Sequence, residues 1–266
     1  MLFSLDFDDA GGKVEKGMRV WCGWVFLVGV VWAYDTSWWA LLPCGSNLPI
    51  QPKLVINSHI RYHRALTYLM HSLASVGFQD YCRLIIVVGG HKEDEISKIG
   101  NITIVKRVIN AHDYTGFDTL YLYRSHPDIE APYYFYVHDT CLFHPSFVSF
   151  FSALPNRMGS NPQTILYPEE KGSSNILAIG KGVVEAIGTT YRFNMTKRQA
   201  WLLEVEGEGI RKFGEVKTTQ NRMGLGDYDI YHTGLKRKLF LYPEFGVFKT
   251  IFWDHTGDME GNPQHF

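Results

Sequence analysis

The stretch Leu84-Ile-Ile-Val-Val-Gly-Gly90 indicates the fold more clearly than any other part of the sequence. An aliphatic run that ends in two glycines is typical of a strand buried on both faces and closed by a turn. Two shorter apolar runs on either side of it, Leu54–Ile56 and Ile102–Val105, predict further strands. Short apolar strands that alternate with amphipathic helices predict an α/β sheet rather than a bundle or a sandwich.

A helix is predicted between each pair of these strands. Apolar residues recur at intervals of three and four in residues 62–76, and Gly77 is suited to end that helix. Asn57 or Ser58 is expected to cap its first turn. The acidic stretch 92–99 is expected to form the second helix. Strands joined in this way pair in parallel, because right-handed crossovers are the common connection between them.

The later part of the chain continues the α/β pattern. We expect a fourth strand at Tyr133–Val137, a helix from Pro145 to Leu154, strands at Thr164–Tyr167 and Asn175–Ile179, and a helix at Lys197–Phe213. Ligands of parallel sheets bind at the carboxyl ends of the strands. That rule predicts one site that gathers Asn57, Ser58, Gly89, Gly90, the segment Asn110–Asp118, and Asp139 at the end of the fourth strand.

The composition is that of a folded protein without a polyanionic partner. The chain has 266 residues, of which 45% are hydrophobic, and this suffices for one substantial core. Lys and Arg number 26 and Asp and Glu number 27, so nucleic acid is not an expected partner. The four cysteines lack CxxC spacing, which favours structural thiols over a zinc or redox site. A disulfide between Cys82 and Cys141 is the alternative.

The amino-terminal region differs from the rest. We divide the chain into a tail (1–19), a hydrophobic helix (20–42), a linker (43–52) and a globular domain (53–266). Cations before the apolar run and tryptophans at its edges indicate a signal anchor that enters a bilayer from the cytoplasmic side. A cleaved signal peptide or a soluble leader remain alternatives, because the core run is shorter than the about 20 residues of a typical span.

Two segments about ninety residues apart carry the candidate chemistry. Pro132-Tyr-Tyr-Phe-Tyr-Val-His-Asp-Thr140 is a β-prone run that places one carboxylate at its end. Gly224-Leu-Gly-Asp-Tyr-Asp-Ile-Tyr-His-Thr-Gly234 is expected to form an acidic turn that leads into a short helical stretch. Together they indicate a nucleotide-sugar site.

On these two segments, residues from 53 to about 258 resemble a GT-A-type glycosyltransferase domain, and the leader is similar to that of type II Golgi enzymes. The resemblance implies a mostly parallel Rossmann-type sheet flanked by helices, and a DxD motif that holds Mn²⁺ or Mg²⁺ against the donor diphosphate. Such a cation neutralises the charge that develops on the leaving group. Here Val137-His138-Asp139 keeps only the last aspartate, so Asp139 is the implied metal ligand, with His138 or Thr140 near the ribose or phosphates.

The second segment resembles the family's late acidic motif, which implies that Asp227 is the general base. A carboxylate is suited to take the proton from an attacking sugar hydroxyl. Asp229 is the neighbouring candidate, and only one of the two is expected to point into the site, because residues spaced by two on a helix do not share a face. A helix-capping role for Asp227 is the alternative. His255 resembles the late histidine ligand of the metal, the alternative being a tail histidine without a role.

The resemblance also implies residues that contact substrate. Ser174 and Asn175 fall where the acceptor-side strand and glycine of the family lie. Asp113, Thr115 and Asp118 fall where nucleotide or donor sugar is bound, with loop chemistry as the alternative. His59 and His63 are not read as a zinc peptidase pair, because His-Ile-Arg-Tyr-His lacks the glutamate base.

The function expected from these features is transfer of a sugar from a nucleotide diphosphate donor, uridine-based, to a glycan or glycoprotein acceptor, with inversion. The expected location is single-pass and type II, facing the Golgi or ER lumen, which two sequons, Asn101-Ile-Thr103 and Asn194-Met-Thr196, support weakly. A catalytically silent nucleotide-sugar or glycan-binding module is the first alternative, and a nucleotidyltransferase is the second. The sequence has no P-loop, dinucleotide-binding glycine motif or nucleophile elbow.

Overall fold

The computed structural model describes residues 51–80, 83–111, 113–168, 176–191, 212–218, 223–228 and 237–251. In chain order the elements are β1 (Lys53–His59), η1 (Ile60–Tyr62), α1 (His63–Ser75), β2 (Leu84–Gly89), β3 (Glu95–Ile99), β4 (Ile102–Lys106), α2 (Asp113–Leu122), β5 (Tyr133–His138), β6 (Cys141–Phe143), α3 (Phe147–Met158), β7 (Thr164–Tyr167), β8 (Ile176–Gly180), α4 (Lys181–Tyr191), β9 (Glu215–Thr218), β10 (Met223–Tyr228), β11 (Arg237–Tyr242) and β12 (Val247–Ile251). Within these residues, no helix combines the length and the apolar character that crossing a membrane requires. The expected hydrophobic helix 20–42 lies outside them.

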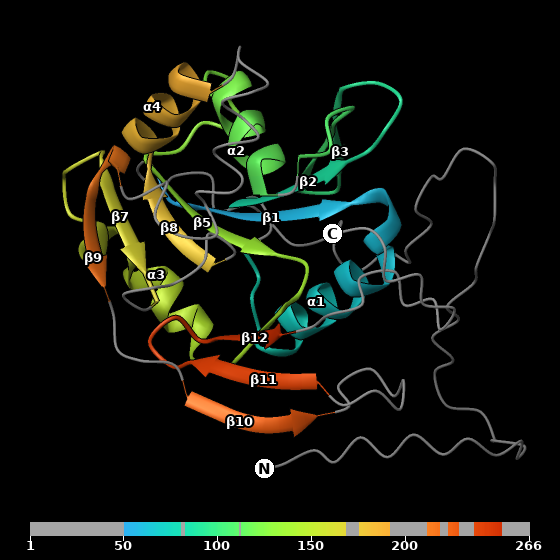
Figure 1. Ribbon diagram of the computed structural model, residues 1–266, viewed down its shortest axis with the longest axis vertical. Coiled ribbons are helices and arrows are strands. Elements are labelled where there is room, and N and C mark those ends of the chain that lie inside the picture. Colours follow the sequence, from blue (N-terminus) through green and yellow to red (C-terminus); the bar gives the residue numbers. More distant parts are fainter. Residues whose placement is uncertain are drawn as a thin grey trace, which may run out of the picture.

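The main sheet is mostly parallel, as the sequence predicts. Its strand order is β3-β4-β2-β1-β5-β8-β7-β9. The four central strands β4, β2, β1 and β5 are parallel to one another, and β8 runs antiparallel to both of its neighbours. The fold class is therefore mixed α/β with a mostly parallel sheet between helices (Figure 1).

Alternate residues of the central strands pack into two separate cores, one on each face of the sheet. In β1, Leu54 and Ile56 belong to one core and Val55 belongs to the other. In β5, Phe135 joins the first core and Tyr134 joins the second. All five side chains have no exposed surface, which explains why these strands are continuous apolar runs. Helices α2 and α4 cover one face, and α1 and α3 cover the other (Figure 1).

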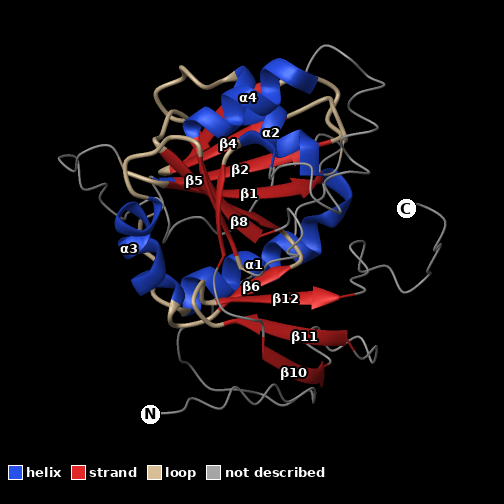
Figure 2. Ribbon diagram, turned by 60° about the vertical axis from the view of Figure 1, so that its left-hand side comes forward, coloured by secondary structure: helices blue, strands red, loops and turns tan. Residues whose placement is uncertain are grey.

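A second, smaller sheet lies beyond α1 and α3. Its strand order is β10-β11-β12-β6, and all of its pairs are antiparallel (Figure 2). Strand β6 follows β5 after a turn made by Asp139 and Thr140. The chain therefore passes from the main sheet to the second sheet directly after the predicted metal ligand.

The expected helix at 92–99 is wrong, because these residues contain strand β3. Strand β3 pairs antiparallel with β4, and Gly100, at φ +58, lies in the tight turn between them. A glycine with positive φ in a two-residue connection is typical of a hairpin. The parallel pair β2 and β4 is thus joined through an edge strand instead of a helix.

Two further expectations need correction. Asn57 and Ser58 do not cap a helix, because β1 continues to His59, whose Nδ1 accepts a hydrogen bond from the Arg61 amide and caps η1. The alternative that Asp113, Thr115 and Asp118 are loop residues does not hold, since α2 begins at Asp113. Both differences lengthen a regular element at the carboxyl edge of the sheet.

Candidate functional site

The candidate site lies where β1 and β5 end side by side. From β1 the chain proceeds to β2 and then to β4 on one side, and it returns to add β5 on the other side of β1. Strands β1 and β5 therefore form the topological switch point of the sheet. Connections diverge in opposite directions from such a point, and this is where open α/β sheets bind ligands.

A hydrogen bond between Ser58 and Asp139 spans this switch point. The Ser58 hydroxyl donates to Asp139 Oδ2 at 2.7 Å, and the Asp139 amide donates to the Asn57 carbonyl at 3.2 Å. Asp139 is 1% exposed and Ser58 is 6% exposed. A buried carboxylate is costly unless other groups stabilise its charge, so the serine hydroxyl both stabilises and orients it.

A second contact joins the same two strands one residue earlier. Asn57 Nδ2 lies 3.2 Å from His138 Nε2. Because an amide nitrogen only donates, Nε2 accepts this hydrogen bond, and a neutral His138 carries its proton on Nδ1. Asn57 is 3% exposed, whereas His138 is half-buried. The Asn57 amide thus fixes the orientation of the His138 ring at the end of β5.

The end of β2 forms the neighbouring part of the edge. At Gly89 an added Cβ would lie 2.9 Å from the Ile109 carbonyl oxygen, so only glycine fits there without a shift of the backbone. At Gly90, φ is +84 and an added Cβ would overlap the His59 imidazole. The two glycines therefore let the 109–110 backbone and the His59 ring approach the strand closely.

A buried ion-pair cluster lies at the end of β4, and sequence reasoning missed its central residue, Arg107. The guanidinium contacts Asp118 at 2.9 Å, Asp94 at 3.0 Å and the Thr119 hydroxyl at 2.8 Å. Asp94 also accepts a hydrogen bond from the Val108 amide at 2.7 Å. The cluster fixes the turn before β3 to helix α2. An arginine directly after a buried strand is the signal that could have located it.

Cys141 and Lys249 lie directly across from one another in strands β6 and β12. Cys141 is a buried free thiol, so it is not part of the disulfide with Cys82 that the sequence left open. Burial raises the pKa of the Cys141 thiol to about 12, and the positive charge of Lys249 opposes that shift. Cys141 is therefore a structural thiol, because only the thiolate is strongly nucleophilic.

The structure corrects the local conformation expected around Asp227. Residues 223–228 form strand β10 instead of an acidic turn, and Asp227 is paired with Lys238 of β11. Three strand spacings separate β10 from β6, which corresponds to about 14 Å. The role of Asp227 as the base stays a prediction, since only its backbone is described.

The other predicted residues divide into described and undescribed ones. Asp118 is 3% exposed and holds Arg107, and the Thr115 hydroxyl accepts a hydrogen bond from the Ala111 amide at 2.8 Å. Thr140 is buried beside Asp139, and Asp113 is the first residue of α2. Their contacts with substrate stay predictions. Four predicted residues lie outside the described ones: Ser174, Asn175, Asp229 and His255.

The metal ion predicted at Asp139 would have few protein ligands among the described residues. Within the described ranges, no group of three or more His, Cys, Asp and Glu side chains is arranged to hold a metal ion. Magnesium sites that carry a substrate phosphate use one or two carboxylates, and water and phosphate oxygens supply the other ligands. Asp139 therefore fits a site completed by substrate, and the described residues do not form a closed metal cage.

The comparisons with known proteins assign no family to this chain. No family model matches it, and no curated protein matches it. A similar solved structure is that of the inositol-1-phosphate CTP transferase from T. maritima, with 13% identity and a TM-score of 0.35, over 65% of this chain and 86% of that one. Values this low do not transfer an activity, so function has to be argued from the site itself.

Proposed function

We propose that this protein is a glycosyltransferase that uses a nucleotide diphosphate sugar, with the donor bound at the carboxyl ends of β1 and β5. The observation that carries the proposal is the hydrogen bond from Ser58 to Asp139 across the switch point. A carboxylate held at this place in an α/β sheet is suited to a phosphate-bearing ligand through a divalent cation. The resemblance of the Asp139 and Asp227 segments to GT-A-type motifs adds the reaction class.

The buried polar groups at the switch point support a ligand site over a purely structural turn. Asn57, Ser58, Asp139 and Thr140 are each at most 6% exposed, and they come from the end of β1 and the turn after β5, which are distant in sequence. Burying polar groups costs free energy that apolar residues would not cost. A strand end that served packing alone would be expected to carry apolar residues, as the middles of β1 and β5 do.

The proposed reaction assigns separate roles to the residues of the site. An acceptor hydroxyl attacks the anomeric carbon, the bond from that carbon to the donor phosphate oxygen breaks, and the nucleoside diphosphate leaves with the electron pair. The hydroxyl proton passes to a carboxylate base, for which Asp227 and Asp229 are the candidates. Bound Mn²⁺ or Mg²⁺ would stabilise the charge of the leaving diphosphate. Asp139 would hold that ion, Ser58 would orient Asp139, and His138 would face the ribose or phosphates.

The cellular setting is part of the proposal. The amino-terminal pattern supports a type II anchor at 20–42 with the domain in the Golgi or ER lumen, acting on a glycan or glycoprotein. Protease protection in microsomes is the test. Luminal orientation predicts that residues after 53 resist protease until detergent is added. Digestion without detergent would contradict it.

The activity is tested with the full chain and a panel of UDP-, GDP- and CDP-linked sugars, by following release of nucleoside diphosphate with Mn²⁺ and with a chelator. We expect one donor class to be turned over, and Asp139→Asn to lower that rate at least about 100-fold. Glu130→Gln is the matched control, because Glu130 binds Lys181 at the opposite edge of the sheet. Equal rates for wild type and Asp139→Asn would overturn the proposed role of Asp139.

The same assay distinguishes the alternatives. Donor binding without turnover by the wild type would identify a silent binding module, which the lack of a three-ligand metal group among the described residues favours as second candidate. Release of pyrophosphate from a nucleoside triphosphate and a sugar phosphate would instead identify a nucleotidyltransferase. Asp227→Asn and Asp229→Asn test the base: the correct one loses turnover and retains nucleotide binding.

A further inference from the structure

Lys249 occupies an unusual position for a lysine, on the inward face of the second sheet. In the antiparallel pair of β12 and β6, Lys249 is directly opposite Cys141. Directly opposite residues of an antiparallel pair project from the same face of the sheet. Cys141 has no exposed surface and packs in the core that also contains Leu54 and Phe135 of the main sheet. The Lys249 side chain therefore starts on the face that looks toward the main sheet.

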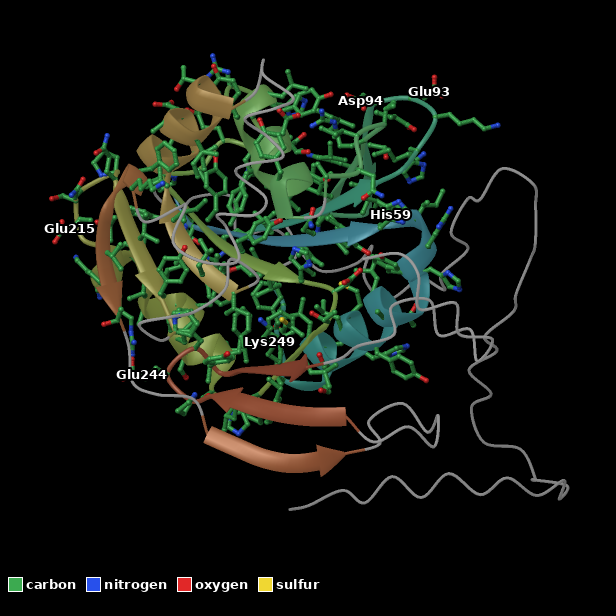
Figure 3. The ribbon with its side chains drawn as sticks, in the orientation of Figure 1. His59, Glu93, Asp94, Glu215, Glu244 and Lys249 are labelled. Carbon is green, nitrogen blue, oxygen red and sulfur yellow. The ribbon has the colours of Figure 1, made fainter. Side chains whose placement is uncertain are left out.

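The neighbours of Lys249 confirm this orientation. Val247, two residues earlier in β12, lies opposite Phe143, and both are buried in the same core as Cys141. Residues two apart on a strand share a face, so Val247 and Lys249 form one row. The row passes from the core at Val247 to a half-buried lysine at the next position. Figure 3 shows Lys249 on the side of β12 that faces the main sheet.

The strand that pairs with this row begins two residues after Asp139. Cys141 is separated from Asp139 only by Thr140, so the residue across from Lys249 is two positions from the carboxylate. A lysine side chain is long enough to bring its ammonium group from the inward face to the edge where Asp139 lies. Lys249 of the second sheet and Asp139 at the end of β5 are thus connected through Cys141, which lies opposite Lys249 and two residues after Asp139.

We propose that Lys249 binds the diphosphate of the donor, on the side of Asp139 that belongs to the second sheet; this inference rests on the proposed function. A lysine ammonium binds phosphate as a compact point charge. The motif around Asp139 has Val137 where a first carboxylate would stand, so the protein itself contributes little charge for a metal. The positive charge of Lys249 can bind the diphosphate directly, without the second carboxylate that the motif lacks. On this proposal the second sheet takes part in ligand binding.

The test compares Lys249→Met with Lys249→Arg in the full chain, using UDP, GDP, CDP and the matching monophosphates as probes in isothermal titration calorimetry. We expect Lys249→Met to weaken binding of the preferred diphosphate about 10- to 100-fold, the effect typical of losing a charged hydrogen bond. The monophosphate should lose less than about 3-fold, because the outer phosphate is the expected contact. Lys249→Arg keeps the charge and should stay near wild type.

Lys181→Met is the matched control, since Lys181 is a half-buried lysine at the opposite edge of the main sheet. Lys249→Gln, which keeps a polar head group, is a second variant in case Lys249→Met does not fold, and it should show the same loss. A wild type that binds one diphosphate while both Lys249→Met and Lys249→Gln bind it equally well overturns this inference and leaves the proposed function in place. A wild type that binds none of the three diphosphates overturns both.

Discussion

The two edges of the main sheet differ in whether charged side chains are buried. At the carboxyl edge, Asn57, Ser58, Arg107 and Asp139 are each at most 6% exposed. At the amino edge, charged side chains form ion pairs in contact with water, such as Lys98 with Asp128 at 2.5 Å and Lys181 with Glu130 at 2.6 Å. Exposed ion pairs contribute little to stability, because their charges stay hydrated. Buried polar groups lose their hydration, so they destabilise the fold unless hydrogen-bond or ion-pair partners replace the water. Among the described residues, the buried charged side chains Arg107, Asp118 and Asp139 all belong to the carboxyl edge, whereas the buried polar residues at the starts of β4 and β7 are the uncharged Thr103 and Thr164. Burial of charge is therefore what distinguishes the edge of the candidate site.

The largest expected effect is loss of the cation in the buried cluster of the carboxyl edge. Arg107→Met removes the partner of Asp118, which is 3% exposed, and should lower the free energy of unfolding by about 3–5 kcal/mol. Lys98→Met removes an exposed pair at the amino edge and should cost less than about 1 kcal/mol. Urea denaturation measures both. If Arg107→Met and Lys98→Met lowered the free energy of unfolding by similar amounts, the buried cluster would be no more important for stability than the exposed pair.

The next largest effect is expected at the Ser58 hydroxyl. Ser58→Ala leaves Asp139 Oδ2 without its 2.7 Å donor and should cost about 1.5–3 kcal/mol, the usual worth of a hydrogen bond to a charge. Donor turnover should fall with it, because Asp139 is no longer oriented. Ser152→Ala is the control, since its hydroxyl bonds to the Val148 carbonyl on an exposed helix face and should change stability by less than about 0.5 kcal/mol. A Ser58→Ala variant with wild-type turnover would contradict the orienting role.

A smaller effect separates two glycines with similar backbone geometry. Gly77 at φ +76 has open space around it, whereas Gly90 at φ +84 faces the His59 ring. Gly77→Ala should cost about 1 kcal/mol for the left-handed conformation alone. Gly90→Ala should cost at least about 1 kcal/mol more, because the ring must move as well. Thermal unfolding of both variants checks the difference, and equal costs would mean that the close approach at Gly90 is easily relieved.

The smallest effect concerns pH and the amino edge. Burial lowers the pKa of Lys53 from 10.5 to about 8, and the charge of Asp128 opposes the shift. Between these two pH values the unfolded chain holds the proton that the folded protein releases, so this lysine makes stability rise with pH across that window. The rise should be less than about 1 kcal/mol, because solvent screens a half-buried group. Urea denaturation from pH 7.5 to 10.5 should show a flatter profile for Lys53→Met than for wild type. Parallel profiles would exclude Lys53 as the cause.

The central strands were predictable because burial on both faces leaves a direct record in the sequence. Runs such as 54–56 and 84–88 are apolar since both cores of the sheet require it. The same reasoning failed for β3, an edge strand with exposed Glu95 and Lys98, whose composition does not differ from that of a solvated helix. The Gly100-Asn101 pair was the available signal for a hairpin. Edge strands lack the burial that makes central strands recognisable.

The candidate site was predictable only in part. Asp139 lies directly after β5, as its position after an aromatic run predicts, and Asn57 and Ser58 lie across from it at the end of β1. The position of Arg107 after a buried strand was a usable signal, but its partners Asp94 and Asp118 were not predictable, because they come from a turn and a helix on different sides of it in sequence. The position of Lys249 opposite Cys141 was not predictable either, because it follows only from the pairing of β12 with β6. Contacts set by tertiary pairing leave no local pattern.

The turn at Asp139 and Thr140 has a consequence for how the chain can vary. This turn connects β5 to β6, so the number of residues in it determines which side chains of β6 point toward the core. Adding or deleting one residue there would exchange the faces, moving Leu142 toward the core and Cys141 and Phe143 away from it. A substitution at Asp139 or Thr140 alters the contacts of one side chain. An insertion or deletion there would reverse which side chains of the whole strand β6 face the core. For the packing of the second sheet, the spacing between His138 and Cys141 is therefore a stricter constraint than the identity of the two residues between them.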